Sequence, residues 1–326
     1  MSVGTQDDRT SRIRALGVPC IAMRLQSCRN AVLSVGLAFL LLLLSVGGAA
    51  ARSVTPASYP IGSVVNGLRY CTRAGAKLRL DLYYPTSSRY RHAPVVLWIH
   101  GGTWITGSRS QASGDPQVAL LRARGFAVAA MDYSLAPAHK FPDPVQDLTC
   151  GVRYLRANHV SLHIDRYRIG ALGVSAGGHL AAMLGVDDGS SAFIGGGFPG
   201  VSSSVKAVAA LYGVHDLTLH DLASYDEREL PHIFGPKRDW AVASPIHYVR
   251  EGVAAFLLVH GDKDTDVPIE QSQHMARALH NHHVNEHMIV VHNAEHGLAP
   301  SGGPISPTRE SIEQAVVDFF VHRMQL

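Results

Sequence analysis

The sequence has 326 residues, of which 46% are hydrophobic, and its formal net charge is only +3. A chain of this length can bury one large core, because single α/β domains often exceed about 250 residues. The Lys and Arg residues are scattered along the sequence rather than clustered. This composition lacks the basic pattern typical of nucleic-acid-binding proteins, and it does not by itself imply a polyanionic partner.

The N-terminal segment has the pattern of an export signal. An uncharged, leucine-rich stretch at 30–51 follows Arg24 and Arg29, and it ends in small residues. We expect residues 1–51 to be a signal peptide that is cleaved after Ala51. An uncleaved membrane anchor is the alternative, because about 20 apolar residues can span a bilayer. Both interpretations place the folded domain outside the cytoplasm, secreted, periplasmic or in the cell envelope, with membrane contact only through an uncleaved segment.

Two cysteines, Cys71 and Cys150, follow this segment. An oxidising compartment would permit a bridge between them. However, Cys71 falls in an early predicted strand and Cys150 in a predicted helix, and a disulfide needs Cα atoms within about 7 Å. We therefore expect two buried thiols that pack as small apolar groups.

After an irregular linker at 52–64, we expect one domain over residues 65–326. It starts with a strand in which Leu78, Leu80 and Leu82 alternate with charged residues, the pattern of an antiparallel edge region with one exposed face. The later apolar runs do not alternate, as expected of parallel strands that are covered on both faces. These runs are 95–99, 126–130, 169–172, 205–211 and 255–259.

Helix signals lie between these runs. Asp143 can cap a helix that has Pro144 at its first position, Pro268 opens another, and Ser306 with Pro307 repeats the capping device. The alternation of strands and helices predicts an α/β fold with a mostly parallel central sheet and helices on both faces. Residues 216–249 are rich in proline and weakly periodic, and we expect a partial cap there, with an ordinary surface excursion as the alternative.

The segment Gly173-Val174-Ser175-Ala176-Gly177 follows one predicted strand and precedes the apolar helix at 180–184. A serine on a sharp strand-to-helix turn needs small neighbours, because the turn is strained and the chains approach closely. The start of the helix also places free N–H groups beside a developing negative charge. This context predicts that Ser175 is a nucleophile.

A second loop, His100-Gly101-Gly102-Thr103-Trp104, ends the strand at 95–99. We expect the backbone N–H groups of Gly101 or Gly102, together with that of Ala176, to form an oxyanion hole. His100 is expected to hold the loop through a side-chain hydrogen bond. Trp104 is either a wall of the substrate pocket or core, and we favour the pocket.

A serine nucleophile needs a base to take its proton, and the base needs an acid to fix its tautomer. His296, in a loop and followed by glycine, is the predicted base. Four aspartates compete for the role of acid, and we choose Asp264. Asp262 follows the strand so closely that a role in the turn is favoured, Asp266 is placed to cap the next helix, and Asp216 is a further option.

No metal or organic cofactor is needed for this chemistry. The histidines at 280, 282, 283 and 287 are close in sequence, but no matching cluster of ligands accompanies them. We expect them to be solvated residues of a loop or helix end.

Four motifs in this order resemble those of the hormone-sensitive-lipase-like esterases, and more closely the bacterial feruloyl/acetyl-xylan esterase and arylformamidase-like branch. They are 100–104, 132–137 with Phe141, Pro142 and Asp147, 173–178 and 261–268, and the resemblance covers about residues 60–326. It implies an α/β-hydrolase fold, a triad of Ser175, Asp264 and His296, and oxyanion donors at Gly101, Gly102 and Ala176. Thr103 stands where the lipase branch usually has glycine, which favours the Gly-Gly-x-Trp branch.

The resemblance implies a serine carboxylesterase that hydrolyses short-chain acyl esters, acetyl or aryl, through an acyl-enzyme on Ser175. Its partner would be a small-molecule ester, with no nucleic acid involved. An amidase, formamidase or peptidase-like hydrolase would use the same triad and stays an alternative. A non-catalytic binding protein on a hydrolase fold is the second alternative.

Overall fold

The computed structural model describes residues 60–326 except 74, 88–89, 188–192, 220–228 and 325–326. All of the described residues belong to one compact unit, Pro56–Leu326. The predicted signal or anchor and most of the predicted linker lie outside the described residues. Among the residues that are described, no helix is both long and apolar enough to cross a bilayer.

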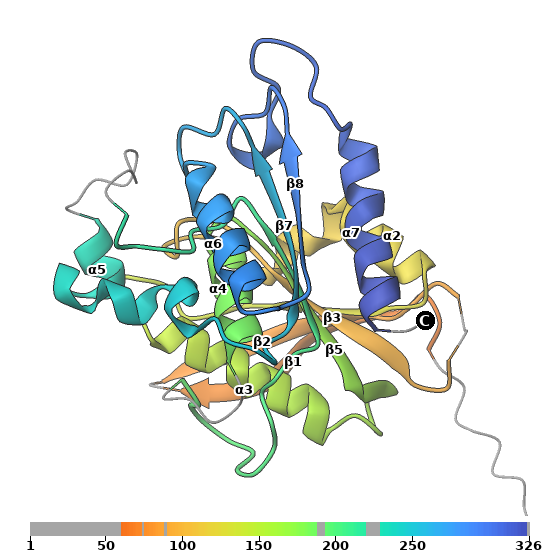
Figure 1. Cartoon of the computed structure of the whole chain (residues 1–326). Helices are drawn as coiled ribbons and strands as arrows, with labels where there is room; N and C mark the ends of the chain where they lie inside the picture. Colours follow the sequence, from red (N-terminus) through yellow and green to blue (C-terminus); the bar gives the residue numbers. More distant parts are fainter. Residues whose placement is uncertain (1–59, 74, 88–89, 188–192, 220–228, 325–326) are drawn as a thin grey trace, which may run out of the picture. The chain divides into compact units, whose positions relative to one another are not determined.

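The core of this unit is an eight-stranded sheet with the order β1-β2-β4-β3-β5-β6-β7-β8 (Figure 1). β2 is antiparallel to both of its neighbours, and all other neighbouring strands are parallel. The strands are β1 (Val64–Arg73), β2 (Ala76–Tyr83), β3 (Ala93–Ile99), β4 (Ala127–Met131), β5 (Ile164–Val174), β6 (Ala207–Leu211), β7 (Ala255–Gly261) and β8 (Glu286–Val291).

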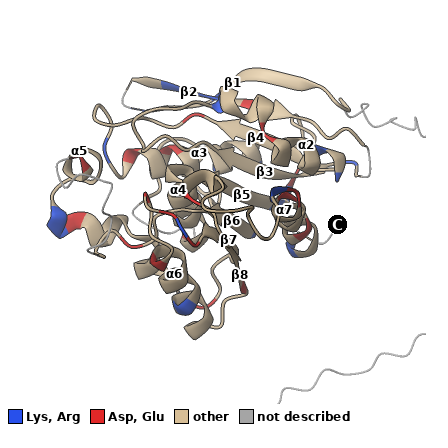
Figure 2. Cartoon of the chain, turned by 90° about the horizontal axis from the view of Figure 1, so that it is seen from above, with Lys and Arg blue, Asp and Glu red and all other residues tan. Residues whose placement is uncertain are grey.

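Helices cover both faces of the sheet, and Figure 2 shows α3, α4 and α6 on one face with α2 and α7 on the other. Each face has its own hydrophobic cluster, and α2 packs against α7. The α-helices are α2 (Pro116–Ala123), α3 (Asp143–Ala157), α4 (Ala176–Val186), α5 (Leu230–Phe234), α6 (Glu270–Asn281) and α7 (Arg309–Arg323), and the 3₁₀ helices are η1 (Arg109–Gly114), η2 (Lys237–Ala243), η3 (Pro245–Tyr248) and η4 (His296–Leu298).

The burial of the strands explains why the sequence pattern was informative. Every residue of β3, β4 and β6 is buried, because helices cover these central strands on both faces. β2 is more exposed at its start, where it pairs with the edge strand β1. The predicted α/β fold, with a mostly parallel sheet and helices on both faces, is confirmed.

Two of the predicted helix caps are wrong. α3 has Pro142 at its N-cap and no side-chain capping bond, because the carboxylate of Asp143 instead accepts a hydrogen bond from Arg73. α7 is capped by Thr308, whose side chain accepts a bond from the backbone N–H of Ser311. The helix expected after Pro268 is present and begins two residues later, at the start of α6.

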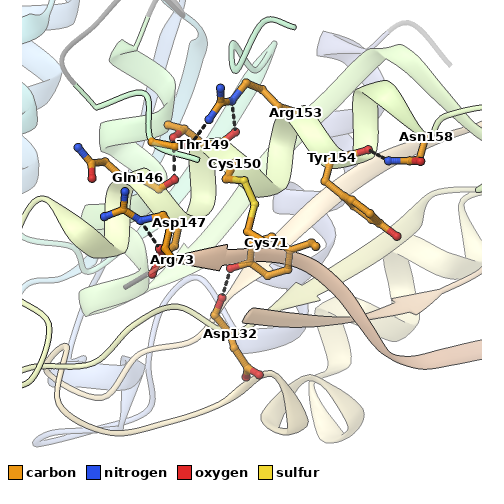
Figure 3. Close-up of a disulfide and its surroundings, with 12 residues drawn as sticks. Cys71, Arg73, Asp132, Gln146, Asp147, Thr149, Cys150, Arg153, Tyr154 and Asn158 are labelled. Carbon is orange, nitrogen blue, oxygen red and sulfur yellow. Dashed lines mark hydrogen bonds and ion pairs between the residues drawn. A yellow bond between two sulfur atoms is a disulfide. The ribbon is translucent and has the colours of Figure 1, made fainter. Parts of the chain in front are cut away.

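Cys71 on β1 and Cys150 on α3 form a disulfide (Figure 3), so the expectation of two free thiols was wrong. α3 packs across β1 and brings the two Cα atoms to 6.4 Å. This separation is within the reach of a disulfide. The sequence could not show the packing, because 79 positions separate the two residues.

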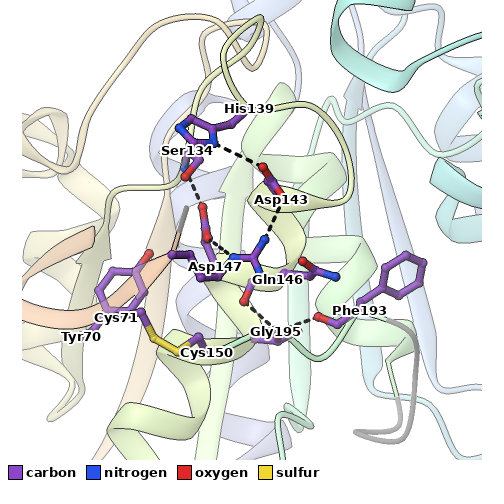
Figure 4. A network of polar contacts seen from close by, with 12 residues as sticks. Tyr70, Cys71, Ser134, His139, Asp143, Gln146, Asp147, Cys150, Phe193 and Gly195 are labelled. Carbon is purple, nitrogen blue, oxygen red and sulfur yellow. Dashed lines mark hydrogen bonds and ion pairs between the residues drawn. A yellow bond between two sulfur atoms is a disulfide. The ribbon is translucent and has the colours of Figure 1, made fainter. Parts of the chain in front are cut away.

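Beside the disulfide, the buried carboxylate of Asp147 ties β1 and α3 to the loop at 132–142 (Figure 4). It accepts hydrogen bonds from the backbone N–H of Ser134 at 2.8 Å and from Nε of Arg73 at 3.0 Å. Burial raises the pKa of Asp147, although the bonds from Ser134 and the charge of Arg73 oppose this shift. The same loop reaches the functional site, where the N–H of Ala136 bonds the carbonyl of Trp104.

Replacing both Cys71 and Cys150 by alanine is expected to lower the free energy of unfolding by about 2–5 kcal/mol, because the bridge restricts a long loop in the unfolded chain. Urea unfolding of the chain that begins after Ala51, with and without the two substitutions, measures the effect. Equal midpoints, or two titratable thiols in the unreduced denatured protein, would contradict it.

Candidate active site

Ser175 lies on a tight turn between β5 and α4, with φ 55° and ψ −120°. A side chain at either flanking glycine would prevent this turn. A Cβ atom on Gly173 would lie 2.0 Å from the carbonyl oxygen of Gly177, and one on Gly177 would lie 2.2 Å from that of Ile99. The glycines therefore permit the close contacts that force Ser175 into a strained conformation with its hydroxyl exposed at the end of the sheet.

His296 connects Ser175 to Asp264. Its Nε2 lies 2.9 Å from Oγ of Ser175, and its Nδ1 lies 2.8 Å from Oδ2 of Asp264. Because a carboxylate only accepts hydrogen bonds, Nδ1 carries the proton and Nε2 is left to accept the bond from the serine hydroxyl. The structure thus brings together the three residues predicted as nucleophile, base and acid, from loops that follow β5, β7 and β8.

The carboxylate of Asp264 is buried and fixed from two sides. Its Oδ1 accepts bonds from the backbone N–H groups of Asp266 at 3.0 Å and Val267 at 2.8 Å. Burial by itself would raise the pKa of Asp264, but hydrogen bonds from His260, His296 and the Val267 N–H outweigh it and hold the pKa below its ordinary value. Asp264 therefore stays ionised where it orients the imidazole.

His260 was not among the predicted residues, and it supports Asp264 on the side away from His296. Its Nε2 bonds the carbonyl of Val267 at 2.8 Å and lies 3.4 Å from Oδ2 of Asp264, while its Nδ1 bonds Oγ of Ser272 at 2.7 Å. The ring is fully buried and joins the turn at 264–267 to α6. A histidine directly after the buried run at 255–259 was the signal that could have identified it.

The other three aspartates do not bond His296. Asp262 accepts a bond from Nδ1 of His292 at 3.0 Å, and Asp216 accepts bonds from the backbone and hydroxyl of Thr218. Asp266 does not cap α6, which has Ile269 at its N-cap and no side-chain capping bond. It lines the pocket at Ser175 instead.

The predicted oxyanion loop lies directly against the serine. A Cβ atom on Gly101 would be 3.3 Å from Cβ of Ser175. Gly102 has φ 112°, and its carbonyl closes the turn by accepting bonds from the N–H groups of residues 105 and 106. Within the described part of the chain, no acceptor binds the N–H of Gly101, Gly102 or Ala176. Gly101 and Gly102 line the pocket at Ser175, and Ala176 directly follows Ser175 at the start of α4.

Trp104 is core, so the favoured interpretation of it as a pocket wall was wrong. Its side chain is 1% exposed, its Nε1 donates to Nδ1 of His179 at 3.1 Å, and its ring meets that of Phe234 edge-on at 4.8 Å. The reason is the backbone at Thr103 and Trp104, where φ is 54° and 61°. The turn directs the indole beneath α4, away from the pocket.

His100 holds the loop as predicted. Its Nδ1 bonds the carbonyl of Gly101 at 2.7 Å, and its ring stacks on Tyr133 with centroids 4.2 Å apart. The hydroxyl of Tyr133 donates to the carbonyl of His100 at 3.1 Å. Burial lowers the pKa of His100, so the ring stays neutral and serves as a structural support.

The pocket at Ser175 has a volume of about 390 Å³, and its walls include Trp98, Gln111 and Tyr212. Tyr212 meets the ring of His296 edge-on at 5.0 Å, and burial raises the pKa of Tyr212 to about 12. Tyr212 directly follows the apolar run at 205–211, and this position was the sequence signal that could have placed it at the pocket. No described residue of 216–249 lines the pocket, and 220–228 lie outside the description, so the partial cap stays a prediction.

No group of three or more His, Cys, Asp or Glu residues among those described is arranged to hold a metal ion. The histidines at 280, 282, 283 and 287 are exposed, and Nδ1 of His280 lies 3.5 Å from Glu286.

The BD-FAE family model matches residues 80–279, which is more than half of the chain. The chain belongs to the BD-FAE family. Among curated relatives, this BD-FAE chain is 30% identical to "Esterase LipC" of Mycobacterium tuberculosis, over 61% of this chain and 51% of that protein. It is 28% identical to "Isoprenylcysteine alpha-carbonyl methylesterase ICME" of Arabidopsis thaliana, over 62% of this chain and 49% of that protein. The chain therefore spans about half the length of these relatives.

Solved structures share the fold of this BD-FAE chain. "Truncated form of carbohydrate esterase from gut microbiota" has a TM-score of 0.70 at 24% identity and covers 83% of this chain and 99% of its own. Esterase 2 of Thermogutta terrifontis with butyrate bound has a TM-score of 0.67 at 25% identity, over 82% of this chain and 96% of its own. These neighbours and the family match confirm the resemblance to α/β-hydrolase esterases.

The role of the acid can be tested on the reactivity of Ser175. Asp264→Asn is expected to slow phosphonylation of Ser175 by a fluorophosphonate probe by about 10³–10⁴-fold, because His296 loses its tautomer. Asp262→Asn is the matched control. It should change the rate less than about threefold, since the side chain of Asp262 bonds His292 and not His296. An equal loss in the two variants, or a larger one at Asp262, would refute the choice of acid.

Two further buried histidines, His179 and His215, are expected to make the free energy of unfolding depend on pH. Burial lowers the pKa of His179 to about 4 and that of His215 to about 3. An imidazole in the unfolded chain titrates near 6.5, so between these values the unfolded state binds more protons than the folded state. Stability is therefore expected to fall as the pH drops from about 6.5 toward 4, by at most about 1.4 kcal/mol per pH unit for each ring.

His215→Gln tests this, since both ring nitrogens of His215 are buried and neither has a hydrogen-bond partner among the described residues. The free energy of unfolding, measured in urea at several pH values, should fall less steeply below pH 6.5 in His215→Gln than in the wild type. His287→Gln, on the exposed face of β8, is the control and should keep the wild-type slope. The account fails if the two variants have the same slope.

Proposed function

We propose that this chain is a serine carboxylesterase that acts through an acyl-enzyme on Ser175. The observation that carries the proposal is the continuous hydrogen-bonded path from Oγ of Ser175 through His296 to the buried Asp264. The relatives named as esterases support the choice of an ester bond. The free N–H groups at Gly101 and Ala176 supply the remaining requirement, a site for a negatively charged oxygen.

The proposed reaction begins when Nε2 of His296 takes the proton of Ser175 and Oγ attacks the ester carbonyl carbon. The carbonyl oxygen becomes an oxyanion that accepts hydrogen bonds from the loop and from Ala176. The His296 imidazolium then gives its proton to the departing alcohol, which leaves an ester on Ser175. Water attacks that ester with His296 again as the base, and the acid is released as the serine regains its proton.

The strained turn at Ser175 contributes to this reaction by placing the backbone N–H of Ala176 next to the serine. Ala176 is the first residue of α4, so its N–H has no acceptor inside the helix and is free to bind a negative charge that develops beside Ser175. One such donor typically contributes about 3–4 kcal/mol to transition-state stabilisation. The donors are backbone groups on rigid elements, so little reorganisation is needed during the reaction.

We further propose that the acyl group is short. The pocket of about 390 Å³ is small, and Trp98 and Tyr212 restrict it. The Thermogutta esterase that resembles this chain binds butyrate and propionate, and another neighbour is named a carbohydrate esterase. An acetyl ester of a carbohydrate or aryl alcohol fits these observations.

We also propose that the domain is exported. The leucine-rich N-terminal segment with its basic flank supports this, and so does the disulfide between Cys71 and Cys150. Disulfides form and persist mainly in oxidising compartments.

A panel of nitrophenyl esters of rising acyl length, with an anilide and N-formylkynurenine alongside, tests the proposal. Acetyl and butyryl esters should give the largest kcat/KM, and the two amides should be poor substrates. Ser175→Ala should lower kcat/KM by about 10⁴-fold or more, as expected when a nucleophile is removed. Ser113→Ala, at an exposed serine of η1, is the matched control and should keep full activity.

The outcomes separate the parts of the proposal. Full esterase activity in Ser175→Ala would refute the mechanism. A preference for the amide substrates would refute the esterase and favour the amidase. A flat profile of rate against acyl length would refute only the short-acyl preference.

A further inference from the structure

A second hollow, of about 660 Å³, lies at the other edge of the sheet from Ser175. It is formed where α3 ends, where β5 begins and where the chain enters β6. β5 runs from this hollow to Ser175, and a strand rises about 3.3 Å per residue, so roughly 30 Å separate Arg166 from Ser175. Residues that line this hollow are therefore outside the machinery described above.

The hollow is lined by Arg156, Arg166 and Lys206. Arg156 is fixed, because it donates to the carbonyls of Arg166 at 3.0 Å and Ser204 at 2.8 Å and also to that of Ser202. Arg166 and Lys206 are exposed, and neither forms an ion pair with any described carboxylate. Burial and the charge of Arg166 lower the pKa of Arg156, as expected where positive charges are close together without a counter-ion.

Aromatic rings accompany these cations. Tyr167 is 66% exposed, and the guanidinium of Arg166 lies 4.7 Å from its ring centroid. A neighbouring hollow of about 380 Å³ shares both residues, and there Arg168 lies 4.8 Å from the ring of Tyr90. Asp165 is the one acidic residue lining either hollow in the described chain, and its carboxylate already binds Arg168 and the Tyr167 N–H.

The two hollows therefore form one surface, the basic groove, that combines exposed cations with tyrosine rings and an apolar floor at Val201 and Val205. Guanidinium groups bind carboxylates in two-pronged geometry, and aromatic rings pack against the apolar faces of other rings. A polymer of sugar rings that each carry a carboxylate matches both features. Its charges would meet the cations at the rim while its rings lie over the tyrosines.

We propose that the basic groove binds an acidic polysaccharide, a chain of uronate sugars, and so holds the enzyme on the polymer while Ser175 remains free. A flat lipid surface would not enter a concave site of this kind. Five Lys and Arg residues line the two hollows, and the sequence shows no basic stripe of the kind that follows a nucleic-acid backbone. The sequence shows no cationic cluster at this surface, because only the fold brings together residues 156, 166 and 206.

Binding of polygalacturonate to the full domain tests the proposal without using catalysis, so its result is independent of the proposed esterase activity. Affinity electrophoresis through gels containing polygalacturonate, with dextran gels as the neutral reference, measures retardation and an apparent Kd. Arg166→Glu and Lys206→Glu are each expected to raise Kd at least tenfold, and Tyr167→Ser at least threefold. Arg277→Glu, an exposed charge reversal on α6, is the matched control and should change Kd less than twofold.

Retardation by polygalacturonate that fails in the groove variants but persists in Arg277→Glu would support the groove. No retardation of the wild type, or an equal effect of Arg277→Glu, would overturn it. Single-stranded DNA or anionic phospholipid vesicles could also abolish the retardation when added at the same charge concentration. That result would overturn the proposal, because it would show that the groove attracts anions in general. The thermal midpoint of each variant shows whether it is folded. If a charge reversal disturbs the fold, Tyr167→Ser, which changes no charge, still tests the groove.

Discussion

The structure of the candidate site depends on one constraint, the close approach of the β5–α4 turn to the end of β3. Ser175 can adopt φ 55° only because Gly173 and Gly177 have no Cβ atom. A Cβ atom at these two positions would lie 2.0 Å and 2.2 Å from a neighbouring carbonyl oxygen. The same approach places Gly101 against Ser175 and leaves the N–H of Ala176 at the start of a helix. A single packing requirement thus positions both the predicted nucleophile and the predicted oxyanion donors.

The predicted base and acid reach this turn from the loops that follow β8 and β7. In a parallel sheet the carboxyl ends of the strands lie at one edge, so the loops after β5, β7 and β8 meet there even though they are distant in sequence. His260 then fixes the loop that carries Asp264, and Tyr133 fixes the loop that carries Gly101. The site is therefore held by buried polar contacts behind it as much as by the residues that face the pocket.

The sequence was sufficient for the fold and for choosing Ser175, His296 and Asp264 as residues that lie together, because apolar runs, glycines and loop positions report directly on strands and turns. Their catalytic roles stay a prediction. It was insufficient where the outcome depended on contacts between distant segments. The contact of α3 with β1 decided the disulfide, and a turn with positive φ decided that Trp104 is core. The basic groove likewise exists only after folding, since its cations come from segments that are far apart in the sequence.

The most direct test of the account is to trap the acyl group and locate it. Wild-type protein and the His296→Ala variant, mixed with nitrophenyl acetate, quenched in acid within milliseconds and digested, can be compared by peptide mass spectrometry. The account predicts one acetyl group on Ser175 in the wild type, formed together with a burst of nitrophenol, and a greatly reduced amount in His296→Ala. Rapid turnover with acetyl on another residue, or with no acetylated Ser175 at any quench time, would contradict it.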